Sequence, residues 1–124
     1  MNKGFKILRT IGKELRGIRN SKEISLAEVA EQAGVSTMYI SEIERDIKVP
    51  SDDLIEKLAV IYKVEEVELF EGFGKLTEGM TNEVVNNKDL FELIFNIVEN
   101  PNITEKEKSE FYRNIHQQYV KMCK

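Results

Sequence analysis

One stretch, Leu26–Ile43, constrains the fold of this chain more than any other part of it. Its residues, LAEVAEQAGVSTMYISEI, predict two short helices with apolar side chains at helical spacing, separated by one sharp turn. Gly34 stands where such a turn needs a positive φ angle, which glycine adopts without steric cost. Ser36 can cap the second helix by accepting a hydrogen bond from a free backbone N–H, and Ala30 is small enough to let the two helices approach closely. The stretch therefore predicts a tightly packed pair of helices.

Segments on both sides extend this pair to a bundle of five helices. Ile11, Leu15 and Ile18 recur at spacings of four and three, which predicts one apolar stripe on a first helix. The expected helices are about Ile7–Asn20, Leu26–Ala33 behind a Ser25–Glu28 capping box, Thr37–Glu44, a helix capped by Ser51, and about Val64–Phe70. The inward-facing side chains of the later helices are expected to be Val29, Ala33, Ile40, Ile43, Leu54, Leu58, Ile61 and Val67.

This helix-turn-helix pattern resembles the Cro/phage-repressor-like (XRE) family of DNA-binding domains. Ala30, Gly34 and Ile40 match the small, glycine and branched-apolar positions of that family, and the likeness runs from about Ile11 to about Phe70. The resemblance implies an all-α fold in which residues 1–71 form a five-helix, repressor-like DNA-binding domain. It also implies a sequence-specific transcriptional regulator whose partner is double-stranded DNA.

The second helix of the pair is the expected recognition helix. By the resemblance, Thr37, Met38 and Glu42 occupy base-contacting positions, where Met38 suits a thymine methyl and Glu42 a cytosine amino group. A gap-filling core position is the alternative for Met38. Glu42 would be repelled by phosphates unless Arg45 or Lys48 screens it. The candidates for phosphate contacts, which position such a domain on the duplex, are Ser36, Tyr39, Ser41, Arg45 and Lys48.

The resemblance further implies a structural ion pair. In the family, an arginine late in the first helix pairs with a glutamate that ends the recognition helix, and Arg19 and Glu44 stand at these two positions. Two residues depart from the family pattern. Leu26 replaces a common glutamine that hydrogen-bonds to phosphate, and Asp46 replaces a common glycine, although aspartate tolerates left-handed backbone geometry better than most residues.

The chain changes character after residue 71. Three glycines and several threonines and asparagines predict a linker over residues 72–87, in which a short helix around Thr81–Val85 remains possible. Residues 88–124 then predict a helical hairpin, with helices over about Asp89–Asn100 and Glu105–Lys121. Two helices cannot bury this much apolar surface alone, so the tail packs either on its own domain or on a second copy, and we favour the second copy. The side chains expected at that contact are Leu90, Ile94, Ile97, Phe111, Ile115 and Tyr119.

Charge is distributed unevenly along the chain. The net charge is −4, yet the residues before Ile24 carry seven Lys or Arg against two Glu, whereas those from Val64 onward carry twelve carboxylates against seven Lys or Arg. The basic end can face phosphate while the acidic end faces away, although ordinary solvated surface charge explains the distribution equally well. Lys3, Lys6 and Arg9 could form an arm along a DNA backbone or a disordered lead-in, and the sequence leaves both open.

Other classes of function have little support. His116 and Cys123 are the only histidine and cysteine, and neither belongs to a metal-spaced cluster or a catalytic constellation, so we expect no metal, no cofactor and no enzyme. No apolar run is long enough to span a membrane, and the default location is the cytoplasm. We therefore expect a homodimeric repressor that binds an inverted repeat. The alternative is a protein-interaction module of the antitoxin or anti-repressor type, in which the C-terminal helices bind a regulatory protein.

Overall fold

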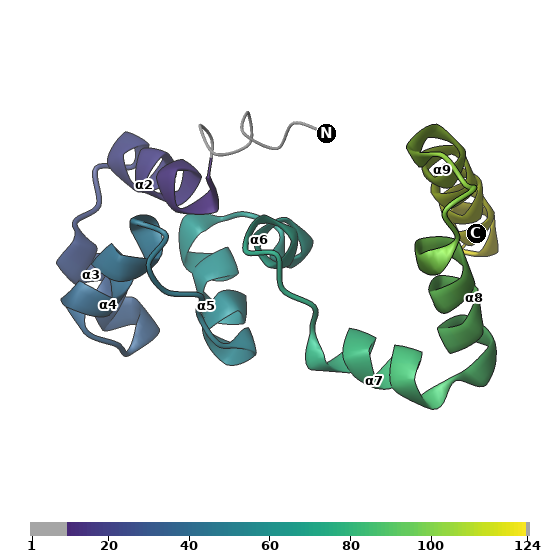
Figure 1. Cartoon of the computed structure of the whole chain (residues 1–124). Helices are drawn as coiled ribbons and strands as arrows, with labels where there is room; N and C mark the ends of the chain where they lie inside the picture. Colours follow the sequence, from purple (N-terminus) through teal and green to yellow (C-terminus); the bar gives the residue numbers. More distant parts are fainter. Residues whose placement is uncertain (1–9, 124) are drawn as a thin grey trace. The chain divides into compact units, whose positions relative to one another are not determined.

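The computed structural model of the chain describes residues 10–123, and every regular element in that range is an α-helix (Figure 1). These residues form two compact units, which meet in the sequence at Glu78 and Gly79. The helices, in chain order, are α2 (Ile11–Ser21), α3 (Leu26–Ala33), α4 (Thr37–Glu44), α5 (Asp52–Tyr62), α6 (Glu66–Gly72), α7 (Glu78–Asn86), α8 (Lys88–Glu99) and α9 (Glu105–Met122). The predicted fold class, a five-helix domain followed by a helical hairpin, is confirmed. The expected arm at Lys3, Lys6 and Arg9 lies outside the described residues.

Side-chain caps determine where the helices of the first unit begin. Ser25 and Glu28 form a reciprocal capping box at the start of α3, in which each side chain accepts a hydrogen bond from the other residue's backbone N–H. The Ser36 and Ser51 hydroxyls accept hydrogen bonds from backbone N–H groups in the first turns of α4 and α5. Gly34 ends α3 at φ 74°, a left-handed conformation that costs glycine little. The turn between α3 and α4 therefore has the geometry that its sequence predicts.

The core of the first unit is centred on α5, which contacts α2, α3 and α6. Ile55 and Leu58 of this helix are completely buried. Because α5 has neighbours on several sides, its buried face is wider than one apolar stripe and includes Ala59 and Tyr62. Ile61, which was expected in the core, is only partly buried. The other apolar side chains of the core are Leu15, Val29, Ala30, Ala33, Ile40, Ile43, Leu54, Leu69 and Phe70.

The prediction for the fifth helix of this unit was wrong in phase. Val67 was expected to pack inward, but it is 70% exposed, and Leu69 and Phe70 fill the core instead. The helix also starts two residues later than predicted, because α6 begins at Glu66 behind an N-cap at Glu65. Val67 and Leu69 lie about 200° apart around a helix with 3.6 residues per turn, so the face that buries Leu69 exposes Val67.

The segment predicted as a linker, residues 72–87, is more ordered than expected. Lys75 forms an ion pair with Asp52 at 2.8 Å and donates to the Pro50 carbonyl at 2.9 Å. The Glu78 backbone N–H donates to the second Asp52 oxygen at 3.1 Å, and α7 begins at this residue. Hydrogen bonds from Lys75 and from the Glu78 backbone lower the pKa of Asp52. One carboxylate at the start of α5 therefore holds the chain that leaves α6.

The second unit has almost no interior. A capping box between Thr104 and Glu107 starts α9, and the Asn87 side chain caps α8. None of the described residues of α7, α8 or α9 is buried. Near the link between α8 and α9, an apolar hollow is lined by Leu93, Ile97, Asn102, Ile103, Glu107, Lys108 and Phe111. Within residues 10–123, no helix combines the length and the apolar character that crossing a membrane requires.

Candidate nucleic-acid interface

The start of α4 presents its side chains to solvent. Thr37 is exposed, and Met38 is 69% exposed, so Met38 does not fill a gap in the core. Ile40 and Ile43, on the opposite side of α4, are each only 1% exposed. Glu42 is partly buried on the helix surface. The three side chains expected at base edges therefore lie outside the core, on a helix whose other face is packed.

The candidates for phosphate contacts stand at the cap of α4, within α4 and in the loop that follows it. The Ser36 hydroxyl caps α4 by accepting from the Tyr39 backbone N–H at 3.1 Å, and its own hydrogen remains available for donation. The Arg45 Nε donates to the Ser41 hydroxyl at 3.1 Å, which places that guanidinium along the end of α4. Lys48 is exposed in the loop that follows.

Glu42 lacks the partner that the sequence suggested for it. None of the ion pairs among the described residues includes Glu42. Of the two suggested partners, Arg45 donates to the Ser41 hydroxyl instead, and Lys48 forms no ion pair within the described residues. A carboxylate can accept a hydrogen bond from a donor such as a cytosine amino group, and it repels phosphate.

Three buried polar side chains fix the far end of α4. The Arg19 guanidinium donates to both Glu44 oxygens, from Nε to Oε2 at 2.8 Å and from Nη2 to Oε1 at 3.0 Å. Arg19 Nη1 also donates to the Ile24 carbonyl at 2.9 Å, and the Tyr62 hydroxyl donates to Glu44 Oε2 at 2.8 Å. Exposure is 9% for Arg19, 4% for Glu44 and 3% for Tyr62. We call these three residues the anchor cluster; it ties α4 to both α2 and α5.

The anchor cluster changes how its members ionise. Hydrogen bonding to Glu44 raises the pKa of Arg19 above its already high ordinary value, so this guanidinium stays charged. Burial raises the pKa of Tyr62, and the hydrogen bond to the Glu44 carboxylate raises it further. The cluster is a bidentate ion pair with a neutral phenol that completes it, and within the described residues no buried side-chain polar atom lacks a partner.

Removing the Tyr62 hydroxyl tests this arrangement. We expect Tyr62→Phe to lower the free energy of unfolding by about 1.5 kcal/mol at pH 7, the typical contribution of a hydrogen bond to a charged group. Tyr112→Phe, which removes an exposed hydroxyl from α9, is the matched control and should change stability little. Urea titrations of the three proteins measure the difference.

The same variant should alter the pH dependence. Because the pKa of Tyr62 is higher in the folded chain than its ordinary value of 10.0, the unfolded chain loses this proton first. The contribution of Tyr62 to the free energy of unfolding is therefore complete below pH 10. It is lost as the pH rises further, by up to about 1.4 kcal/mol per pH unit. The stability of Tyr62→Phe should fall less steeply above pH 10, and parallel curves for the two proteins would contradict the buried phenol.

A second junction joins the end of α4 to the start of α2. Asp46 has φ 63°, and its carboxylate accepts from the Thr10 hydroxyl and from the Gly12 backbone N–H at 3.0 Å. A Cβ on Gly12 would lie 2.6 Å from the Glu44 carbonyl oxygen and 2.8 Å from that of Ile43. Glycine at this position therefore allows α2 to contact the backbone at the end of α4, and Asp46 caps α2 across the contact.

Sequence reasoning identified part of this scaffold. It paired Arg19 with Glu44, and the structure brings these two side chains together. It missed Tyr62, which reads as one more apolar position of α5, and Gly12, which reads only as a weak helix former. Sequence reasoning treated Asp46 as a departure from a family glycine. In the structure its carboxylate accepts hydrogen bonds from Thr10 and Gly12. The described residues contain no group of His, Cys, Asp and Glu that could hold a metal ion.

This geometry defines the class of the first unit. Two helices joined by a left-handed glycine, the second exposing its first turn and anchored at its end, form a helix-turn-helix. Residues 15–69 match the protein-family model described as "Helix-turn-helix", a match that spans a little under half of the chain.

Curated relatives share this part of the chain. It is 32% identical over 73 residues to the HTH-type transcriptional regulator Rv0474 of Mycobacterium tuberculosis, a match that covers 59% of this chain and 52% of the relative. It is 40% identical over 55 residues to the HTH-type transcriptional regulator SinR of Bacillus subtilis, a match that covers 44% of this chain and 50% of the relative. The chain thus spans about half the length of the curated relatives it matches. A solved structure named "SinR protein/SinI protein complex" is 27% identical, with 91% of this chain and 99% of that chain covered and a TM-score of 0.45.

Proposed function

We propose that this chain is a sequence-specific transcriptional regulator that binds double-stranded DNA through α4. The observation that carries the proposal is the combination of an exposed first turn, at Thr37 and Met38, with a rigidly anchored end at Glu44. A recognition helix reads bases with the side chains of its N-terminal part, and its specificity depends on a fixed orientation. Curated relatives named as transcriptional regulators share this segment, which supports the same function.

Salt dependence tests the phosphate contacts. Neutralising Arg45 or Lys48 with glutamine should weaken binding to all DNA sequences and reduce the slope of log K against log salt by about 0.9 for each lost contact. Lys57→Gln removes an exposed charge from α5, outside the proposed surface, and is the matched control. Equal slopes for all four proteins in fluorescence anisotropy titrations would remove these residues from the interface.

We further propose that the chain acts as a homodimer that represses by occupying an inverted repeat. The second unit supplies the reason, because its apolar side chains have no interior to fill. Within α8 and α9, Ile94 is 39% exposed, Phe111 39%, Ile115 42% and Tyr119 58%. A second copy buries the same surface on both partners, and one short recognition helix alone reads few bases.

Charge placed in this surface should separate the copies. We expect Ile94→Asp combined with Ile115→Asp to convert the dimer to a monomer in sedimentation experiments, and to weaken operator binding at least tenfold. Val60→Asp places one carboxylate at a 77% exposed apolar site on α5 and should remain dimeric. A double variant that keeps its oligomeric state and affinity would exclude α8 and α9 as the dimer contact.

A second candidate function rests on the same helices. The second unit carries seven carboxylates against six Lys or Arg, so it lacks the basic excess that a phosphate backbone favours, and its exposed apolar side chains suit a protein partner. In this reading the chain is an interaction module, and the helix-turn-helix serves as its scaffold. Complex formation through α8 and α9 would depend weakly on salt, whereas DNA binding falls steeply with it.

A further inference from the structure

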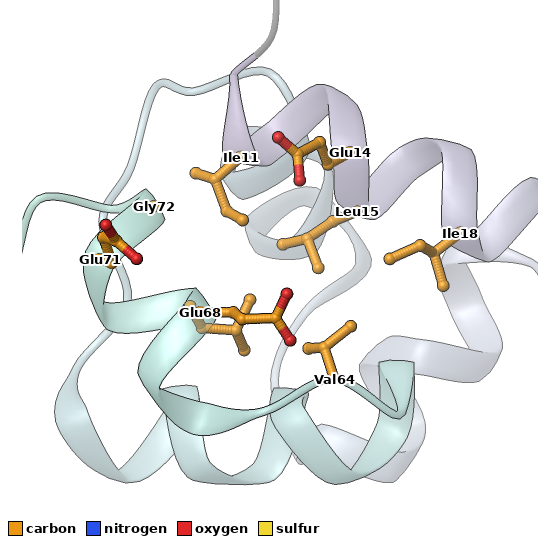
Figure 2. A pocket seen from close by; sticks show the side chains of 9 residues that line it. Ile11, Glu14, Leu15, Ile18, Val64, Glu68, Glu71 and Gly72 are labelled. Atoms are coloured by element: carbon orange, nitrogen blue, oxygen red, sulfur yellow. The ribbon is translucent and has the colours of Figure 1, made fainter. Parts of the chain in front are cut away.

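A groove with an apolar floor and an acidic rim lies between α2 and α6 (Figure 2). Its volume is about 280 Å³. Leu15 and Leu69 at the floor are each 1% exposed, whereas Ile11, Ile18 and Val64 are only partly buried. The groove therefore adjoins the packed core and still offers apolar surface to an occupant.

The rim carries one sign of charge. Figure 2 shows the carboxylate side chains among those that surround the groove, and they belong to Glu14, Glu68 and Glu71. All nine lining residues are described, and none of them is Lys or Arg. Apolar surface within a rim of carboxylates complements a segment that carries cations and large apolar side chains together.

Residues 1–9, MNKGFKILR, have that composition. They contain three cations and no carboxylate, and Phe5, Ile7 and Leu8 supply apolar side chains. The segment joins α2 at Thr10, and the next residue, Ile11, already lines the groove. The lining residues of α2 extend over roughly 10 Å, whereas nine residues of extended chain reach on the order of 30 Å. The segment is thus long enough to dock, and its covalent tether keeps its local concentration high.

The N-terminal end of α2 lies beside the rim. Thr10 is the N-cap, with φ −92° and ψ 161°, and its hydroxyl accepts from the Lys13 backbone N–H at 3.2 Å. Arg9 directly precedes this cap in the sequence, and Glu14, the fourth residue of α2, carries the opposite charge at the rim.

We propose that residues 1–9 dock in the α2–α6 groove of the same chain, with their cations against the acidic rim and their apolar side chains over its floor. No lining residue belongs to α3, α4 or the loop after α4. Docking therefore leaves the proposed DNA surface free, and it holds Lys3, Lys6 and Arg9 away from the role of a DNA arm.

Methyl NMR on the isotopically labelled full-length chain tests the docking. We expect nuclear Overhauser effects between the Phe5 ring and the methyl groups of Leu15, Ile18 and Val64. Their absence would overturn the proposal. Isotope-filtered spectra of a mixture of labelled and unlabelled chains identify the source of the segment, and contacts seen only between chains would overturn docking within one chain.

A charge reversal at the rim gives a second test, because the direction in which the melting temperature changes distinguishes an occupied groove from an empty one. Glu71 lies in the last turn of α6, where a lysine is favourable to the helix dipole, so Glu71→Lys should raise the melting temperature slightly if the groove stays empty. With the segment docked, the same variant should lower it by on the order of 2 °C and weaken the Phe5 contacts. Adding Lys6→Glu to this variant should restore both the melting temperature and the Phe5 contacts. Glu66→Lys, on the same helix but outside the groove, should leave the Phe5 contacts unchanged, and a loss of contacts there would count against the rim.

Discussion

Arg19→Ala is expected to lower the free energy of unfolding by about 3–5 kcal/mol, because it leaves the Glu44 carboxylate buried without its cation. Glu44 is 4% exposed, and without Arg19 only the Tyr62 hydroxyl would still donate to it. A domain of this size has a total stability of about 5–15 kcal/mol, so the variant should melt far below the parent chain. Thermal and urea melts followed by circular dichroism measure the loss.

A matched variant separates the unpaired charge from lost packing. Arg19→Met, Glu44→Leu and Tyr62→Phe together remove every side-chain polar group of the anchor cluster and keep its bulk. Since a buried ion pair can often be replaced by apolar residues at little cost, we expect this triple variant to recover most of the stability. An unchanged midpoint for Arg19→Ala would show that the pair does not hold α4 in place.

The anchor cluster should also couple stability to DNA binding. The Arg19 side chain donates its hydrogen bonds to Glu44 and to the Ile24 carbonyl, and through Glu44 it fixes the helix that carries Thr37 and Met38. Under conditions in which it remains folded, Arg19→Ala should therefore bind DNA more weakly than the parent chain, whereas the apolar triple variant should regain part of that affinity.

Gly12→Ala is expected to be the second most damaging single change, with a cost of about 1–3 kcal/mol from overpacking. Its Cβ would approach two backbone carbonyl oxygens at the end of α4, at 2.6 and 2.8 Å, and backbone atoms cannot move aside as a flexible side chain can. The start of α2 would have to move away from the end of α4, and this movement would also disturb the hydrogen bond from the Gly12 N–H to Asp46. We expect a lower urea midpoint with an unchanged slope.

Gly17 provides the control within the same helix. A Cβ at this position meets no atom within 4 Å, and the residue is exposed in the interior of α2. Gly17→Ala should therefore stabilise the chain by up to about 1 kcal/mol through helix propensity alone. We expect the free energy of unfolding to fall in Gly12→Ala and to rise in Gly17→Ala. A stabilising Gly12→Ala would show that α2 does not approach α4 as closely as the structure shows.

The features that sequence predicted well are local ones. Gly34, Ser36 and the Ser25–Glu28 capping box act on atoms within a few residues, so their spacing alone predicts the ends of α3 and the start of α4. The Arg19–Glu44 pairing spans 25 residues and came from the family resemblance, not from spacing.

The features that sequence missed depend on contacts between distant elements. Gly12 matters only because the end of α4, more than thirty residues later, lies against it. Tyr62 joins the anchor cluster from α5, and nothing near it in the sequence indicates a carboxylate partner. Val67 was misplaced because it lies on the face of α6 opposite Leu69, and the packing of α6 against α5 decides which of the two faces is buried.

Selection of the purified full-length chain on randomised duplex DNA, followed by sequencing of the bound pool, tests the proposed function most directly. We expect enrichment of an inverted repeat whose half-sites lie about one helical turn apart, with Met38→Ala and Glu42→Ala each relaxing the preference at a defined base pair. No enrichment above the starting pool, from folded protein at modest salt, would contradict sequence-specific DNA binding and leave α8 and α9 as the functional part of the chain.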